Sequence, residues 1–186
     1  MKSSHLLRVL FAATTFIVAI AFAAESPAPM AKPDPWKAMR PLLGKWEGDV
    51  SGEPGTVKAE REYRFTLNNR FIHVANQSVY PPQEKNPKGE THQDTGFISY
   101  DKAAKKLVLR QFHIEGFVNH YVLDSVSDDG RTIVFATAAI ENIAPGFRGR
   151  ETYRIVRDDE FVETFALAEP GKDFATYSET HFRRKK

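Results

Sequence analysis

Apolar and charged residues alternate along much of the chain, and the first clear case lies between Thr56 and Leu67. Most odd-numbered positions in this segment are apolar, whereas most even-numbered positions are charged. A period of two is typical of a β-strand with one buried face and one face in water. Asn68-Asn69 then predicts a tight turn into a second strand, Arg70–Tyr80, so the two segments form a hairpin.

The same alternation, interrupted by short turn segments, predicts about ten strands in all. The other expected strands are Lys45–Val50, Thr95–Tyr100, Lys106–Ile114, Phe117–Val126, Thr132–Ile140, Arg150–Val156, Glu160–Ala168 and Phe174–Phe182. Short connections favour pairing between consecutive strands, and closure of the sheet removes its two exposed edges. The predicted fold class is all-β: a single antiparallel up-and-down β-barrel of about ten strands, wide enough inside for a small ligand.

The N-terminal region departs from this alternation. Residues 1–23 combine Lys2 and Arg8 with an apolar run and a final Ala-Phe-Ala, which is the order of a cleavable secretory signal peptide. The apolar run is shorter than the roughly 20 residues that span a bilayer. We therefore expect cleavage, no stable membrane anchor afterwards, and a secreted or periplasmic location.

Two further segments complete the predicted organisation. Residues 24–40 form a Pro-rich tether and a short N-terminal segment. Within and just after it, Trp36–Leu43 predicts a short helical turn or a plug. Residues 41–186 form the β-barrel domain.

Charge and cysteine content restrict the possible partners. The chain has 26 Lys and Arg against 24 Asp and Glu, and removal of residues 1–23 leaves 24 of each. A nearly neutral mature chain argues against nucleic acid as the main partner. The chain has no cysteine, which excludes disulfides, a thiol nucleophile and thiolate-bound metals. The composition leaves the oligomeric state open.

Polar residues gather on the predicted hairpin of Lys106–Ile114 and Phe117–Val126. Strand parity places His113, Asn119 and Tyr121 on one inward face, and Arg110 and Glu115 belong to the same polar segment. Because buried polar groups must be paired, this set implies either a ligand or an internal hydrogen-bond network.

Arg61 and Glu163 each interrupt an otherwise apolar inward face of a predicted strand. Two opposite charges on inward faces either pair across the lumen or hold a polar group of a ligand. A β-bulge that turns one of them outward is the alternative.

Signals for metal binding and for nucleophilic catalysis are weak. The segment His113-x-Glu115, with His92 or His120 as a third ligand, resembles part of a metal site, but His113 and His120 fall on opposite faces and no metal-ligand spacing recurs. We therefore predict no metal site. The chain has no G-x-S-x-G elbow and no phosphate-binding glycine loop. An acid–base site that uses His113 with Glu115 or Glu163 is the enzymatic alternative.

Motifs at both ends of the domain resemble known barrels. Gly44-Lys45-Trp46 on the first strand and Arg183-Arg184 on the last resemble the calycin arrangement, in which a tryptophan crosses the barrel floor under a basic side chain. We assign Trp46 and Arg183 to this barrel-closing pair; the alternative is that Trp46 only plugs one end of the barrel. The wider resemblance is to the bacterial DUF1579-type proteins, which are similar to nitrobindin-like haem-binding barrels. The segments that carry it are LGKWEGD at 43–49, YRF at 63–65, NNRF at 68–71, GFISYD at 96–101 and ETHFRR at 179–184.

The resemblance implies a calycin-like barrel of about ten strands with an internal cavity, and it raises haem as a cofactor. Where nitrobindin-like proteins have a proximal histidine on the last strand, this chain has Tyr177, and the nearby histidine is His181. Either side chain can ligate ferric haem.

Three functions follow as expectations. The first is an exported barrel that binds an apolar or amphipathic small molecule in its lumen, of uncertain identity. The second is a haem-binding nitrobindin-like protein with chemistry on nitrogen oxides, and the third is a small hydrolase or isomerase. The candidate ligand-binding residues are Arg61, Arg110, His113, Glu115, Asn119, Tyr121, Glu163, Tyr177 and His181.

Overall fold

The computed structural model of the chain describes residues 33–52, 57–84 and 86–186. The predicted signal peptide at 1–23 and most of the predicted tether lie outside these residues. Residues 34–186 form one compact unit. No helix within the described part of the chain is long and apolar enough to cross a membrane.

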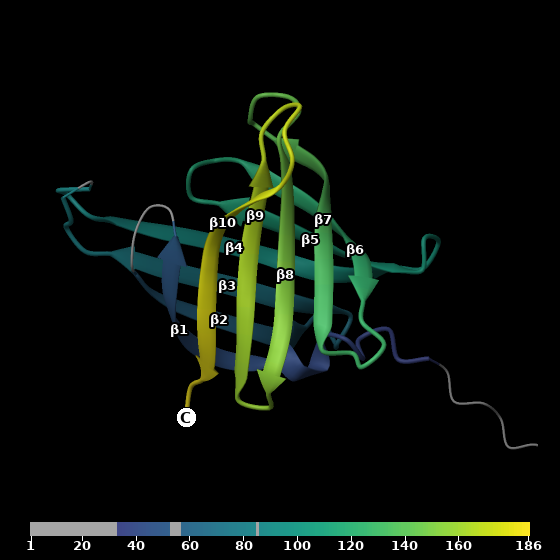
Figure 1. Cartoon of the computed structure of the whole chain (residues 1–186). Helices are drawn as coiled ribbons and strands as arrows, with labels where there is room; N and C mark the ends of the chain where they lie inside the picture. The colour runs from purple at the N-terminus through teal and green to yellow at the C-terminus, as the bar shows by residue number, and fades with distance from the viewer. Residues whose placement is uncertain (1–32, 53–56, 85) are drawn as a thin grey trace, which may run out of the picture. The chain divides into compact units, whose positions relative to one another are not determined.

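Ten antiparallel strands close into one barrel (Figure 1). A 3₁₀ turn, η1 (Arg40–Leu42), precedes the first strand. The strands are β1 (Gly44–Gly52), β2 (Val57–Thr66), β3 (Phe71–Tyr80), β4 (Glu90–Asp101), β5 (Lys106–His113), β6 (Val118–Val126), β7 (Thr132–Glu141), β8 (Arg148–Arg157), β9 (Glu160–Ala168) and β10 (Ala175–Arg184). Each strand pairs with its neighbours in sequence, and β10 pairs with β1. The predicted ten-stranded up-and-down barrel is confirmed.

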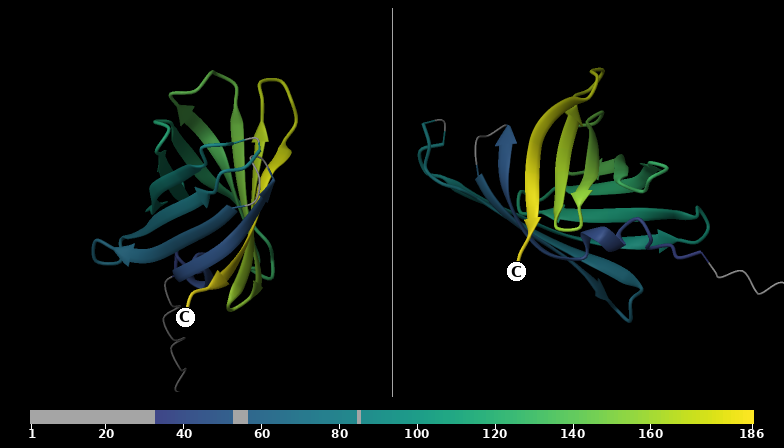
Figure 2. Two further views of the ribbon diagram at one scale, coloured as in Figure 1. Left: turned by 90° about the vertical axis from the view of Figure 1, so that its left-hand side faces the viewer. Right: turned by 60° about the horizontal axis from the view of Figure 1, so that its bottom comes forward.

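The two walls of the barrel run across each other. Figure 1 shows β8 to β10 in front and β2 to β5 behind them at a steep angle, and Figure 2 shows the same crossing from two other sides. Strand tilt of this kind is required to close a twisted sheet. The Asn68-Asn69 turn joins β2 to β3 with φ of 56° and 59°, a left-handed conformation that asparagine tolerates better than most residues.

Strand β4 is longer than predicted. It begins at Glu90, whereas the alternation predicted a strand only from Thr95. The segment from Glu90 to Asp94 is almost entirely polar, so no apolar period marks it as a strand. Its backbone nevertheless pairs with β3 along the whole of this segment.

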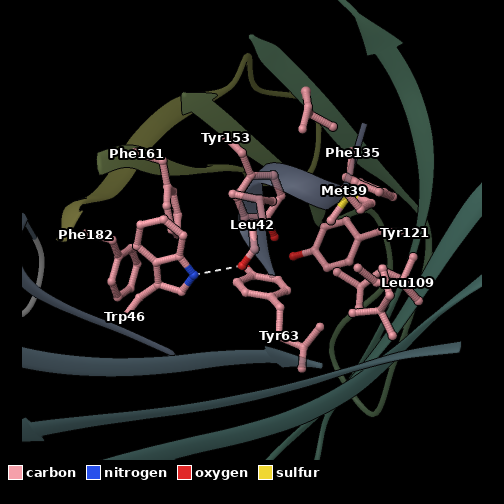
Figure 3. Packing of buried hydrophobic residues seen from close by; sticks show 14 of the residues in the cluster. Met39, Leu42, Trp46, Tyr63, Leu109, Tyr121, Phe135, Tyr153, Phe161 and Phe182 are labelled. Atoms are coloured by element: carbon pink, nitrogen blue, oxygen red, sulfur yellow. Dashed lines mark hydrogen bonds between the residues drawn. The ribbon is translucent and has the colours of Figure 1, made fainter. Parts of the chain in front are cut away.

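One end of the barrel is filled by apolar side chains. Met39 and Leu42, next to and within η1, are buried against Trp46, Phe161 and the aromatic residues around them (Figure 3). The Trp46 Nε1 donates a hydrogen bond of 2.7 Å to the carbonyl oxygen of Leu42, drawn as a dashed line in Figure 3. The helical turn therefore plugs this end, and the indole ties the plug to β1.

The basic residue that covers Trp46 is Arg184, not Arg183 as expected. The guanidinium carbon of Arg184 lies 4.1 Å from the centre of the indole ring. Arg184 also donates to the carbonyl oxygens of Leu43, at 2.6 Å, and Pro41, at 3.0 Å. On β10 the inward positions are even-numbered near the C-terminus, as buried Thr180 and Phe182 show, so Arg183 faces outward.

Candidate functional site

The end of the barrel opposite η1 contains a cavity of about 370 Å³. This volume lies within the usual range for small-molecule sites, roughly 300–1,000 Å³. Apolar, aromatic and polar side chains all line the cavity, and its exposed lining residues are Glu90, Glu115, Ile143 and Tyr177. The apolar and aromatic residues that line it include Tyr80, Phe117, Ile140, Ile143, Phe165, Leu167 and Tyr177.

A buried ion pair crosses the middle of the lumen. Arg61 of β2 and Glu163 of β9 form a salt bridge, and both side chains are more than nine-tenths buried. Arg61 also donates to Asn76 Oδ1 and to Tyr63 Oη, each at 3.3 Å. Of the two possibilities for these charges, pairing across the lumen is the observed one.

The ion pair continues into a hydrogen-bond network centred on Asp94. The Asp94 carboxylate accepts a bond of 2.7 Å from Asn76 Nδ2 and one of 2.8 Å from Gln111 Nε2. Burial raises the pKa of Asp94, but hydrogen bonding with His92 and the charge of Arg61 outweigh it, so the pKa lies below the usual range. Asp94 is therefore a buried carboxylate anion.

Two histidines lie beside this anion at the cavity wall. His92 Nδ1 is 2.6 Å from Glu115 Oε1, and its Nε2 is 3.6 Å from Asp94 Oδ2. The interactions with Asp94 and Glu115 outweigh burial and raise the pKa of His92 to about 9. Burial lowers the pKa of His113 to about 4. At neutral pH the two rings therefore carry different charges in the same cavity.

Four buried polar atoms on the cavity lining have no hydrogen-bond partner among the described residues. They are Gln111 Oε1, His113 Nδ1, Asn119 Oδ1 and Glu151 Oε2. A buried polar group without a partner costs about 1–3 kcal/mol. A ligand or water that supplies complementary groups would remove this cost.

Glu151 has an unusual environment. Burial, followed by the charge of Glu163, raises the pKa of Glu151 well above its ordinary value. Burial likewise raises the pKa of the neighbouring Tyr121 phenol. Glu151 therefore presents a neutral carboxylic acid, a hydrogen-bond donor, to the cavity.

Most of the residues predicted from strand parity lie on this cavity. Arg61, His113, Glu115, Asn119, Tyr121, Glu163 and Tyr177 line it. Asn119 Nδ2 lies 3.1 Å from His113 Nε2 and donates a bond of 3.1 Å to Tyr121 Oη, so part of the predicted polar set is an internal network.

Two predicted residues lie elsewhere. Arg110 and His181 are exposed and do not line the cavity, because each is one residue out of phase with the inward positions of its strand. His181 Nε2 contacts Glu179 Oε1 at 3.0 Å outside the lumen. Neither side chain is placed to contact a ligand in the cavity.

Among the described residues, the structure has no hydrogen bond for the predicted acid–base pairing of His113 with Glu115 or Glu163, and Glu163 pairs with Arg61. Glu115 contacts His92, and the Nε2 atom of His113 contacts the amide of Asn119 instead. The turn after β5 carries Glu115 toward β4, which sequence parity along β5 alone does not indicate.

Tyr177 reaches the cavity because of a β-bulge. The pairing of β10 with β9 shifts register between Thr176 and Ser178, so Tyr177 is the extra residue. Its ring meets Phe165 edge to face, with 5.8 Å between ring centres. The phenol therefore stands at the exposed edge of the cavity, beside Phe165.

Sequence reasoning did not select three of the residues in the polar layer: Asn76, Asp94 and Glu151. All three are buried and line the cavity. Two of them had a usable signal: Asn76 continues the inward series Ile72 and Val74 on β3, and Glu151 precedes inward Tyr153 by two positions. Asp94 had no such signal because its half of β4 lacks apolar alternation.

A second, larger hollow of about 820 Å³ lies over β2 to β5. Much of its lining consists of exposed, outward side chains such as Glu60, Gln77 and Phe112. The interior cavity is the better candidate site because it concentrates the buried, unpartnered polar atoms.

Comparison with known proteins relates this barrel to a described family. The sequence profile of the THAP4-like, heme-binding beta-barrel domain matches residues 36–184. A search of curated proteins finds no match.

Two solved structures share the fold at low sequence identity. Rv2717c from M. tuberculosis is 20% identical, with a TM-score of 0.61 over 86% of this chain and 99% of that one. The S-type phycobiliprotein lyase CPES from Guillardia theta is 13% identical, with a TM-score of 0.50 over 81% of this chain and 92% of that one.

The closed ten-stranded barrel, its lined cavity and a profile match over most of the chain agree with one another. The architecture is that of a barrel that binds a small molecule, and the chain belongs to the THAP4-like, heme-binding beta-barrel domain family.

Proposed function

We propose that the mouth of the barrel binds haem, with the phenol of Tyr177 as the ligand of ferric iron. The observation that carries the proposal is the position of Tyr177. It occupies the place on the last strand where the resemblance implies a proximal ligand, and the bulge of β10 brings it onto the cavity wall. His181, the other candidate on this strand, is exposed on the outer face.

The walls around Tyr177 suit an apolar macrocycle. Phe117, Ile140, Ile143 and Phe165 line the same cavity. Apolar walls would exclude water from both faces of a bound ring, and Phe165 would hold the Tyr177 phenol in place. Haem, when bound, would supply redox chemistry and binding of diatomic gases.

Titration with hemin tests this assignment. The full chain should bind hemin at 1:1 with a shifted Soret band. Tyr177→Phe keeps the aromatic ring and removes the ligating oxygen, so it should weaken binding by about tenfold or more and change the spectrum. His181→Ala is the matched control, because it removes a possible ligand from the outer face of the same strand. Identical Soret spectra for wild type and Tyr177→Phe would overturn the role of Tyr177.

A second candidate ligand is an amphipathic organic molecule with a polar head. The unpartnered atoms of Gln111, His113, Asn119 and Glu151 favour it, because they lie together where a polar head would enter. Native mass spectrometry of protein purified from its own host should then detect a bound organic molecule. Substitution of Gln111 by Leu should reduce its occupancy, since this removes one of the free acceptors. Native spectra that contain only the apoprotein or the haem complex would count against this candidate.

We also propose that the chain is exported and that residues 1–23 are removed. The order of basic, apolar and small residues supports this proposal. N-terminal sequencing of the protein from fractionated cells should give a chain that starts at Ala24, outside the cytoplasm. A chain that starts at Met1 in the cytoplasm would contradict it.

A further inference from the structure

Three side chains with metal-ligating atoms converge on one wall of the cavity. His92 and Asp94 are two residues apart on β4 and share its inward face, and Asp94 is paired with His113 of β5 in the strand register. One ligand atom from each of the three lies within 4.8 Å of the others. Residues of two neighbouring strands therefore form a compact group of two imidazoles and a carboxylate.

Each of the three side chains also has a partner that fixes its orientation. Glu115 Oε1 is 2.6 Å from His92 Nδ1, which leaves His92 Nε2 directed toward Asp94. A bound metal ion would take the place of the proton on this Nε2. Gln111 and Asn76 each donate to one oxygen of the Asp94 carboxylate. Partners of this kind set the tautomer and the angle of ligating side chains in metal sites.

Asn119 allows His113 to present a free lone pair. Its amide nitrogen is 3.1 Å from His113 Nε2, while Asn119 Oδ1 and His113 Nδ1 are both buried without a partner among the described residues. If the amide is turned over, Oδ1 accepts a hydrogen bond from a protonated Nε2. His113 Nδ1 then carries the lone pair. The flip also makes Asn119 Oδ1 the acceptor for the Tyr121 hydroxyl and moves Nδ2 to the position that Oδ1 held.

We propose that His92, Asp94 and His113 bind a divalent first-row transition-metal ion, of which Zn²⁺ is the representative probe. Two imidazoles and one carboxylate are a ligand set used for zinc and for non-haem iron. Mg²⁺ and Ca²⁺ prefer oxygen ligands, so this set discriminates against them. Three protein ligands leave a further coordination position open, and the ligating residues all line the cavity.

The site is independent of the proposed haem ligand. The metal ligands belong to β4 and β5, whereas Tyr177 belongs to β10. The sequence pattern predicted no metal site because His113 and His120 fall on opposite faces and no metal-ligand spacing recurs, and Asp94 was not among the candidate ligands. The register of β4 with β5 brings Asp94 beside His113 and makes the group.

Calorimetric titration of tag-free, chelator-treated, haem-free full chain with ZnCl₂ tests the proposal. Wild type should bind one Zn²⁺ per chain, and MgCl₂ should give no saturable signal. His92→Ala and His113→Ala should each weaken Zn²⁺ binding by at least about tenfold. His120→Ala is the matched control, since His120 forms a similar pair with Glu141 away from the cavity and should not change the affinity.

A second measurement does not depend on the folding of variants. In wild type, one equivalent of Zn²⁺ should shift the imidazole NMR signals of His92 and His113 and leave those of His120 and His181 in place. Absence of 1:1 binding, or shifts confined to His120 and His181, would overturn the proposal. Tyr177→Phe should bind Zn²⁺ like wild type, so failure of the haem assignment and failure of the metal site are distinguishable.

Discussion

Burial has different consequences for two carboxyl groups in the centre of the lumen. Burial raises the pKa of Glu163, but the charge of Arg61 opposes the rise. Glu151 has no such ion pair, and its Oε2 has no partner among the described residues. Glu151 is therefore the group that keeps its proton to higher pH.

This difference predicts a pH-dependent stability for Glu151→Gln. The pKa of Glu151 in the folded state lies above 4.5, so ionisation penalises the folded state more than the unfolded one. The contribution of Glu151 to the stability of wild type should therefore be most favourable below about pH 4.5. It should fall by at most about 1.4 kcal/mol per pH unit up to the folded pKa. Glutamine cannot ionise, so the free energy of unfolding of the variant should increase relative to that of wild type as pH rises.

Urea unfolding at several values between pH 5 and pH 8 measures this gain. Glu84→Gln, on an exposed loop, is the control and should follow wild type across the range. A constant difference between Glu151→Gln and wild type at all pH values would show that Glu151 does not hold an extra proton in the folded state.

Single residues differed in how well the sequence located them. Clear apolar alternation surrounds four inward residues, so strand parity placed them on the correct face. They are Arg61, His113, Asn119 and Glu163. Asp94 lies in a polar half-strand, where alternation carries no information. Its position depends on backbone pairing with β3 and β5.

At the scale of elements, the two ends of the sheet meet at the closed end of the barrel. Arg184 of β10 stacks on Trp46 of β1 and donates to the carbonyl oxygens of Pro41 and Leu43 beside η1. It also donates to the carbonyl oxygen of Asp158 in the turn between β8 and β9. One side chain thus joins β1, η1, β10 and this turn.

The arrangement predicts unequal effects for two adjacent arginines. Arg184→Ala removes a cation–π contact and several charge-assisted hydrogen bonds, and should lower the free energy of unfolding by about 2–3 kcal/mol. Arg183→Ala, on the outer face, should change it by about 0.5 kcal/mol or less. Chemical denaturation measures both, and equal losses would contradict the assignment of Arg184 as the closing residue.

The sequence indicated where the strands lie, but it did not always indicate which residues of a strand face the lumen. The sequence showed Arg183 and Arg184 at the end of the last strand. Which of them covers Trp46 became clear only from the inward positions of Thr180 and Phe182. The bulge at Tyr177 is a further phase change. A one-residue shift moves a side chain to the other face of the sheet.

At the scale of the whole barrel, the lumen has three layers along its axis. Apolar residues around Trp46 fill the closed end, the Arg61–Glu163 network crosses the middle, and the cavity opens at the other end. Four of the buried polar atoms without a partner among the described residues line this open part of the lumen.

Barrel closure predicts the effect of removing the last strand. Deletion of residues 175–186 leaves β1 and β9 without a partner on one side and exposes Trp46 and Phe161. The truncated chain should lose cooperative thermal unfolding and bind a hydrophobic dye. Deletion of Lys186 alone should leave the transition intact. Circular dichroism measures the thermal transition. A cooperative transition in the longer deletion would show that closure is not required for folding.

The sequence by itself determined the all-β class, the number of strands and their consecutive pairing, because hydrophobic alternation and turn residues are local signals. It also indicated part of the cavity lining, including Arg61, Asn119 and Glu163. Only the tertiary structure decided that Arg61 pairs with Glu163, that Tyr177 reaches the mouth, and that His92, Asp94 and His113 meet. Those contacts depend on the register between strands and on one bulge, and such long-range geometry is not written in the spacing of residues along a single strand.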